Sequence, residues 1–300
     1  MSMSPRVTEN SVRTRVMGNL QRSLGRTHTT MEQISSGKQL HRPSDSPTGT
    51  VTALQLRGEV RANQKYSLNA DDAFGRLGML QDNLQSMTSL MSRVRELALE
   101  GASTGTTSPE ANAARAAEID QIKGTLLQQA NSKYLDRPVF GGATVGSEAY
   151  DMSGAYVGES TVQTLRAVGP NAKVRVDLGG PEVFGAEGSP TQLFRVLDDL
   201  STAIRASDHT AINAGMKNLD QASDLVKSTL SEVGARYNRV TQMKQSAEDR
   251  LMSVSSQLSG IEDIDLPKAI MDLQLQQNSY QAALAATAKV VQPSLIDFLR

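Results

Sequence analysis

Apolar side chains recur at alternating spacings of three and four residues along four long stretches of this 300-residue chain. The pattern runs through residues 17–34, 70–98, 226–258 and 266–291. This is the period of helices that pack along a narrow seam, as in coiled coils. The third stretch predicts a helix over about residues 210–259, which would be roughly 75 Å long at ~1.5 Å per residue. A helix of that length favours a long bundle over an ordinary globular domain.

The composition supports long helices rather than the core of a large globular enzyme. Aromatic residues make up only 4% of the chain, and tryptophan and cysteine are absent. Narrow seams between helices need few of the rings that fill compact interiors. The formal net charge of -1 excludes a global basic field that would attract nucleic acid. The absence of cysteine excludes disulfide bonds and thiolate metal sites.

Charge is distributed unevenly between the two ends of the chain. Residues 1–61 contain nine Lys or Arg and four Asp or Glu, whereas residues 262–300 contain three and five. Opposite signs would suit direct pairing of the ends, and two separately solvated faces would fit the same counts. No apolar run is long enough to span a bilayer, so no membrane partner is expected.

The character of the sequence changes between residues 138 and 188. Glycine and β-forming residues become frequent, and Val174, Val176 and Leu178 alternate with polar side chains. This period of two predicts a small β-rich insertion between two helical halves. The expected fold class is mainly α: an elongated antiparallel helical bundle or coiled coil with a small β-rich inserted domain. The expected parts are residues 1–47, 48–137, 138–188, 189–260 and 261–300.

Three helix starts are predicted from local signals. Ser108 precedes Pro109, which suits an N-cap followed by proline at the first helical position. Ser189 and Gln192 stand three apart and predict a capping box at the start of the next helix. Pro267 is tolerated in the first turn of a helix, so the last helix is expected to begin at about residue 265.

The stretch SSGKQLHRPSDSP, residues 35–47, interrupts the first helical pattern. Gly37 stands where a left-handed residue would end a helix, and Pro43 stiffens the loop that follows. Ser46 with the proline after it, or Asp45, is expected to cap a second helix that begins near Thr48. The stretch therefore predicts a stop, a turn and a new start, with the signature residues Gly37, Pro43, Asp45 and Pro47.

The same stretch contains the residue types of a hydrolase triad. His41, Ser44 and Asp45 lie close together in the sequence, whereas triad partners usually come from distant positions and also need an oxyanion hole. His28 and His209 stand alone, without a ligand-like neighbour at helical spacing. The sequence therefore predicts no enzyme, no catalytic residue, no metal site and no cofactor.

The first and last helical stretches each carry a seam that needs a partner. A lone helix is marginal in water, because most of its stability comes from packing. These ends are expected to bundle with equivalent segments of neighbouring copies through contacts that build tubes or filaments. The candidate assembly interface consists of Met17, Leu20, Leu24, Met31, Ile34, Leu273, Tyr280, Leu284, Val291, Leu295 and Phe298.

Several motifs resemble those of the flagellin superfamily. They are ISSGKQLHRPSDSPTG near the start, GARYNRV at residues 234–240, and the segment that begins DIDLPKAIMDLQ and runs to the C-terminus. RPVFGG at residues 137–142 and SLIDFL at residues 294–299 are most similar to the branch of flagellar hook-associated proteins of type 3, the second hook–filament junction proteins. The resemblance covers about the first 140 and the last 110 residues. Ser46 and Pro267 depart from the usual pattern.

This resemblance implies a structural adaptor subunit at the hook–filament junction, located outside the cell on the flagellum and exported without a cleaved signal peptide. Its implied partners are the first hook–filament junction protein, flagellin, other copies of the same chain in a ring or tube, an export chaperone and the flagellar type III export apparatus. Two alternatives remain open. One is a minor filament flagellin, and the other is an intracellular coiled-coil scaffold.

Overall fold

The architecture comes from a computed structural model that describes residues 9–103, 108–144 and 146–291. Within these ranges the chain forms seven α-helices and four short β-strands. The prediction of a mainly α fold with a small β insertion is confirmed. The chain divides into two compact units, one containing residues 1–61 and 252–300 and the other containing residues 62–251.

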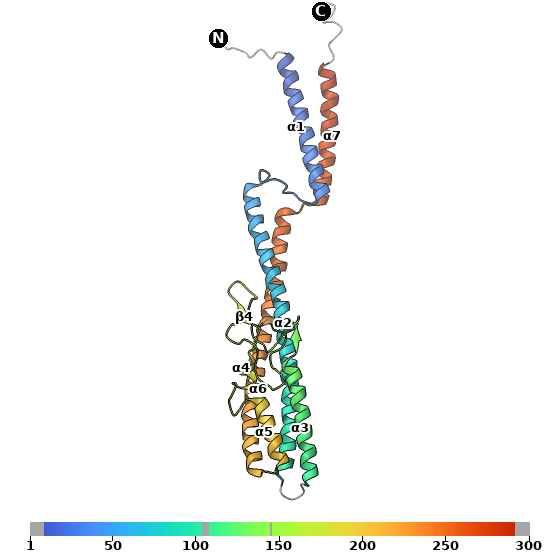
Figure 1. Ribbon diagram of the computed structural model, residues 1–300. Helices are drawn as coiled ribbons and strands as arrows, with labels where there is room; N and C mark the ends of the chain where they lie inside the picture. The colour runs from blue at the N-terminus through green and yellow to red at the C-terminus, as the bar shows by residue number, and fades with distance from the viewer. Residues whose placement is uncertain (1–8, 104–107, 145, 292–300) are drawn as a thin grey trace, which may run out of the picture. The chain divides into compact units, whose positions relative to one another are not determined.

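The elements follow one another in a simple order along the chain (Figure 1). The helices are α1 (Glu9–Ser36), α2 (Pro47–Ala102), α3 (Pro109–Ala130), α4 (Gly180–Phe184), α5 (Leu193–Arg205), α6 (His209–Glu262) and α7 (Leu266–Val291). The strands are β1 (Lys133–Tyr134), β2 (Arg137–Pro138), β3 (Leu165–Ala167) and β4 (Lys173–Arg175), all between α3 and α4. The predicted helix over about residues 210–259 is therefore confirmed as α6.

The second unit is built on an antiparallel pair, α2 and α6. Lys244 Nζ of α6 lies 2.6 Å from Asp71 Oδ1 of α2. One turn along, the rings of Phe74 and Tyr237 lie with their centroids 4.5 Å apart. Partners advance along α2 as they recede along α6, which is the signature of antiparallel packing.

Helices α3 and α5 complete a four-helix bundle with this pair. Arg93 Nε of α2 lies 2.8 Å from Glu118 Oε1 of α3, and Lys123 Nζ of α3 lies 2.6 Å from Asp198 Oδ2 of α5. The side chain of Leu200 in α5 then packs closely against α6 at a glycine. Each helix therefore contacts two of the others, and their apolar faces meet in one continuous core.

The core of the bundle follows the predicted seams. On α2 the predicted seam residues are buried apart from Phe74, which is 39% exposed; the buried ones are Ala70, Leu77, Leu80, Leu84, Met87, Met91, Val94 and Ala98. On α6 every seventh residue is buried: Val226, Val233, Val240, Ala247 and Val254. The other α6 seam positions, such as Leu230, are half-buried. The seams of these two helices are thus used within the molecule.

The insertion between α3 and α5 contains two separate two-stranded antiparallel sheets, β1–β2 and β3–β4. Val174, Val176 and Leu178 are all buried, as the predicted period of two requires. An aromatic cluster fills the interior, and its ring centroids lie 5.0–5.5 Å apart. The cluster consists of Phe140, Tyr150, Phe184 and Phe194, all nearly inaccessible to solvent.

One charged group of the insertion is completely buried. Asp177 has no exposed surface, and its carboxylate accepts hydrogen bonds from Thr164 N at 2.8 Å and Arg175 Nε at 3.0 Å. Arg76 of α2, only 7% exposed, also lies in the field of this carboxylate. Burial lowers the pKa of Arg76, and the charges of Asp177 and Asp72 oppose that shift. A buried ionic cluster therefore links the insertion to α2.

The helix starts agree with two of the three local predictions. Ser108 caps α3 by accepting a hydrogen bond from Ala111 N at 3.2 Å, and α7 begins at Leu266. The capping box at Ser189 is wrong, because α5 begins later and Gln192 is its N-cap. The Gln192 side chain accepts from Arg195 N at 2.7 Å and donates to a backbone oxygen of the insertion at 3.0 Å. A tertiary contact thus shifted the start of this helix.

Two glycines offer a matched test of backbone strain in the second unit. Gly142 has φ +65°, and a Cβ placed there would lie 2.0 Å from Glu159 O. Gly124 lies in helix α3, with nothing within 4 Å of such a Cβ. We expect Gly142→Ala to lower the free energy of unfolding by about 2 kcal/mol or more, and Gly124→Ala to raise it by ~0.5–1 kcal/mol. Urea unfolding followed by circular dichroism measures both, and equal effects would contradict the strained backbone at Gly142.

Candidate assembly interface

The terminal helices α1 and α7 lie side by side and antiparallel in the first unit (Figure 1). Thr30 Oγ1 of α1 lies 3.3 Å from Gln276 Oε1 of α7, and it also donates to Arg26 O at 3.1 Å. The predicted seams of the first and last helices therefore meet each other, at least in part, within one chain. What each residue contributes follows from the pattern of burial along the two helices.

An inner seam is formed by those half-buried and buried positions that alternate at spacings of four and three along both helices. On α1 these are Val16, Leu20, Ser23, Thr27, Thr30 and Ile34, and on α7 they are Ala269, Leu273, Gln276, Tyr280, Ala283 and Thr287. Ala269 alone is fully buried among them. Small and polar side chains occupy much of the inner seam, so the pair buries little apolar surface.

Larger apolar side chains lie outside the inner seam. On α1 they recur at intervals of seven, and they are Met17, Leu24 and Met31, exposed by 58%, 43% and 49%. On α7, Leu266, Ile270 and Leu284 are exposed by 44–46% on one side, whereas Met271 and Leu275, exposed by 63% and 65%, lie on another side of the helix. The sequence pattern predicted one seam on each helix. The structure instead has two adjacent stripes on each, one that faces the other terminal helix and one that faces outward.

The two outward stripes lie on the same side of the pair. At 100° per residue, each stripe is displaced from the centre of its inner seam by about 80° in the same rotational sense. Because α1 and α7 are antiparallel, equal displacements bring both stripes to one side. We call this surface, formed by Met17, Leu24, Met31, Leu266, Ile270 and Leu284, the outer face.

The candidate interface residues are distributed between these two surfaces. Leu20, Ile34, Leu273 and Tyr280 contribute to the inner seam, whereas Met17, Leu24, Met31 and Leu284 lie on the outer face. Val291 is the last residue of α7, and Leu295 and Phe298 lie outside the described residues.

The first unit contains little core of its own. Among its described residues, the buried apolar side chains are Ala53, Leu56, Val254 and Ala269, whereas the second unit holds the whole continuous cluster described above. Large exposed apolar patches on a protein mark interaction sites. The exposed apolar side chains of the first unit, which has few buried ones, are therefore the candidate contact surface for another protein.

The turn after α1 has the conformation that the sequence predicts. Gly37 has φ +71° and its amide donates to Gln33 O at 2.9 Å, which ends the helix. Asp45 N donates to Arg42 O at 3.0 Å, so that Pro43 stands at the second position of a β-turn, where its fixed φ is favourable. Pro47 is the first residue of α2.

The sequence left open whether Ser46 or Asp45 caps α2, and the structure gives the two residues different roles. Ser46 Oγ accepts from Gly49 N at 3.1 Å and therefore caps α2. Asp45 instead accepts from the backbone amides of Arg42 at 2.8 Å and His41 at 3.1 Å. These two hydrogen bonds, with that of Arg42 the stronger, lower the pKa of Asp45. The Asp45 carboxylate thus engages the backbone of the turn rather than the imidazole of His41.

One set of contacts at this turn was not found in the sequence. Lys38, directly after Gly37, lies 2.6 Å from Asp263 and 3.5 Å from Glu262, and Arg57 also contacts Glu262. The partners are separated by more than 200 residues, so no local pattern could reveal the pairing. The signal that the sequence offered was the pair of adjacent acidic residues, Glu262 and Asp263, at the end of α6.

The described part of the chain contains neither a metal-binding cluster nor a membrane-spanning helix. No group of three or more His, Cys, Asp or Glu side chains there is arranged to hold a metal ion. None of the helices described is both long enough and apolar enough to cross a bilayer.

Comparison with known protein families gives two matches. The family model of the bacterial flagellin N-terminal helical region matches residues 7–135. The model of the bacterial flagellin C-terminal helical region matches residues 216–299. Together these matches include α1, α2 and α3 at one end, and nearly all of α6 with α7 at the other.

Individual relatives agree with these matches. The flagellar hook-associated protein 3 of Escherichia coli K12 is 26% identical over 285 residues, covering 85% of this chain and 87% of the relative. A flagellin of Bacillus subtilis 168 is 23% identical over 300 residues, covering 96% of both. The solved structure of a putative flagellar hook-associated protein from Vibrio parahaemolyticus shares the fold, with a TM-score of 0.65 and 19% identity over 73% of this chain and 100% of that one.

Proposed function

We propose that this chain, which belongs to the flagellin family, is a structural adaptor subunit that joins the hook of the bacterial flagellum to its filament. The outer face of the α1/α7 pair is the observation that carries the proposal. It leaves methionine, leucine and isoleucine side chains 43–58% exposed on helices that bury little surface against each other. Equivalent helices of neighbouring subunits would cover this face, and contacts between unlike surfaces extend into tubes.

The relatives' names support the position at the junction. A hook-associated protein aligns with most of this chain, and the terminal sequence motifs resemble the same branch. As partners we propose the first hook–filament junction protein on one side, flagellin on the other, and further copies of this chain around the tube. Before assembly we propose an export chaperone and the flagellar type III export apparatus, which would deliver the subunit to the outside of the cell. The role involves no catalysis.

Residues 1–47 and 261–300 would serve as the assembly segments in this scheme. The middle of the chain, with its own core, would stay folded whether or not the subunit is assembled. The β-rich insertion would face outward from the tube. A minor filament flagellin is the second candidate, because the Bacillus subtilis flagellin aligns over 96% of both chains.

Deletion of the gene distinguishes these functions. Without an adaptor, exported flagellin cannot attach to the hook. We therefore expect hooks without filaments, and flagellin released as monomer into the medium. Electron microscopy of the cells and immunoblotting of the medium measure both, and a plasmid copy of the gene is the matched control. Normal filaments on the deletion strain would instead favour a minor flagellin. Wild-type protein confined to the cytosol after shearing and fractionation would contradict both flagellar roles.

A further inference from the structure

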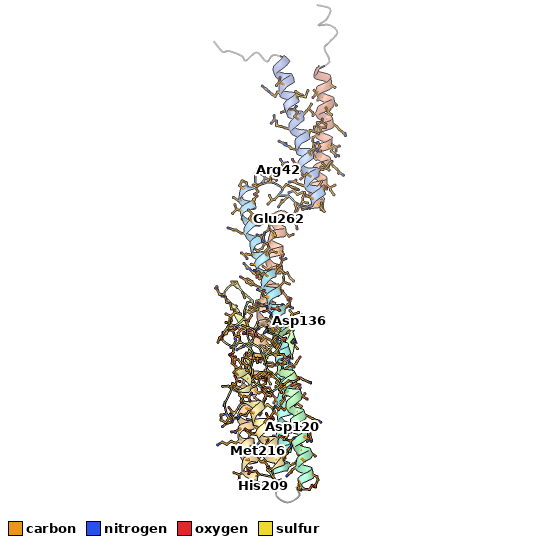
Figure 2. The ribbon with its side chains drawn as sticks, in the orientation of Figure 1. Arg42, Asp120, Asp136, His209, Met216 and Glu262 are labelled. Atoms are coloured by element: carbon orange, nitrogen blue, oxygen red, sulfur yellow. The ribbon has the colours of Figure 1, made fainter. Side chains whose placement is uncertain are left out.

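We propose that Glu262 is a positioning residue of an ionic clasp that fixes the α1/α7 pair to the start of α2 and the end of α6. The clasp consists of Gly37, Lys38, Gln39, Arg57, Glu262, Asp263 and Ile264, all of which belong to the first unit. It deepens the proposed function, on which it rests, because it sets the direction in which the outer face is presented to neighbouring subunits. Figure 2 labels Glu262 at this turn.

The clasp has a backbone part that joins the two chain segments entering and leaving the terminal helices. Gln39 N donates to Glu262 O at 2.7 Å, and Ile264 N donates to Gly37 O at 3.0 Å. Lys38 and Asp263 form an isolated antiparallel bridge between these two hydrogen bonds. Two loops that are distant in the sequence are thus joined like a very short sheet.

The side chains around Glu262 bring three elements together. Glu262 is only 3% exposed, and Arg57 Nε of α2 lies 2.7 Å from its Oε1. Lys38 Nζ, from the turn after α1, lies 3.5 Å from its Oε2. The buried carboxylate of Glu262, at the end of α6, therefore contacts one cation from α2 and another from the turn after α1.

Burial decides which acid of the clasp matters more. Lys38 also contacts Asp263 at 2.6 Å, but their side chains are 45% and 43% exposed. Exposed ion pairs contribute little, whereas a buried charge that loses its partner is strongly destabilising. The clasp therefore depends mainly on Glu262, with Asp263 as a secondary partner of Lys38.

A further hydrogen bond on each side keeps the loops in place. Gln39 Nε2 donates to Ile261 O at 2.6 Å, and Gln33 Nε2 of α1 donates to Gln39 O at 2.9 Å. The last turn of α1 and the last turn of α6 are thereby connected through one glutamine. Without these contacts the two loops between the helices would be free to bend separately.

Amide hydrogen exchange of the full-length monomer tests the clasp directly, with Glu262→Gln as the variant. The amides of Gln39 and Ile264 are the reporters because both cross the bridge. We expect their protection to fall at least about tenfold, because the variant loses the charge-assisted contacts by which Glu262 holds Lys38 and Arg57. Asp272→Asn, a carboxylate on α7 outside the clasp, is the control and should leave both amides within about twofold of wild type. Unchanged protection in Glu262→Gln overturns the proposal.

A double-variant cycle separates a specific ionic contact from general loosening. If Arg57 acts through Glu262, then Arg57→Met should reduce protection in the wild-type background but add nothing to Glu262→Gln. Additive losses overturn the assignment of Glu262 as the group through which Arg57 acts. Circular dichroism controls for the overall fold of each variant.

Swimming tests the consequence for assembly. Glu262→Gln should reduce the soft-agar swimming diameter to that of the deletion strain, whereas Asp272→Asn should swim normally. Lost protection with normal swimming overturns the positioning role. A deletion strain that keeps its filaments refutes the proposed function, and the exchange measurement still decides whether the clasp exists.

Discussion

Cells whose only copy of this protein carries Leu24→Glu together with Met31→Glu are expected to be non-motile, with flagellin released into the medium. Both side chains lie on the outer face, where they are 43% and 49% exposed. Carboxylates buried against a neighbouring subunit without cations would each cost several kcal/mol, roughly enough to abolish an assembly contact. Soft-agar swimming and immunoblotting of the medium measure the effect.

The isolated monomer is expected to tolerate the same two changes. The replaced side chains are nearly half exposed, and Glu has nearly the helix propensity of Leu and Met. The melting temperature and helical circular dichroism should therefore match wild type. Met152→Glu in the insertion, where the side chain is 99% exposed, is the control for added charge at an exposed methionine. If the double variant swims normally, or if its monomer unfolds, the outer face is not an interface between subunits.

The largest loss of stability is expected from Asp177→Ala. The substitution leaves Thr164 N and Arg175 Nε without their acceptor, and it removes a counter-charge from the buried Arg76, whose Nε has no hydrogen-bond partner. Breaking a buried ionic cluster on one side typically costs ~3–5 kcal/mol. Urea unfolding should show a lower midpoint with an unchanged slope.

An exposed aspartate provides the matched control for this prediction. The Asp199 side chain is 67% exposed and lies 3.8 Å from Arg195, so Asp199→Ala should change the unfolding free energy by less than about 0.5 kcal/mol. Adding Arg76→Met to Asp177→Ala should recover part of the loss, because the uncompensated charge is then gone. A loss of under about 1 kcal/mol in Asp177→Ala alone would show that the cluster is not a determinant of stability.

Local features of the sequence predicted much of the fold. Ser108 with Pro109, Gly37 and Pro47 each determine a helix end through their own geometry, so those ends needed no knowledge of distant residues. The three–four spacing of α2 and α6 likewise identified their buried faces. Gln192 misled the prediction because its amide group binds the backbone of Gly154, a contact that only the folded insertion provides.

The candidate site was harder to predict because spacing does not say what covers a residue. Met17 and Leu20 both fit a three–four pattern, yet one faces outward and the other faces α7. Only the burial in the folded chain divides them. The pairing of Lys38 with Glu262 is equally invisible, since nothing local marks which of many acids a lysine will meet.

The threonines and glutamine of the inner seam have a consequence for the lifetime of the α1/α7 pair. Little apolar surface is buried between the two helices, so separating them exposes little apolar surface to water. A subunit arriving at a growing end can therefore trade its internal pairing for contacts with those already seated, at little energetic penalty. Leucine at the same positions would hold α1 and α7 together more tightly and would slow the addition of subunits to the assembly.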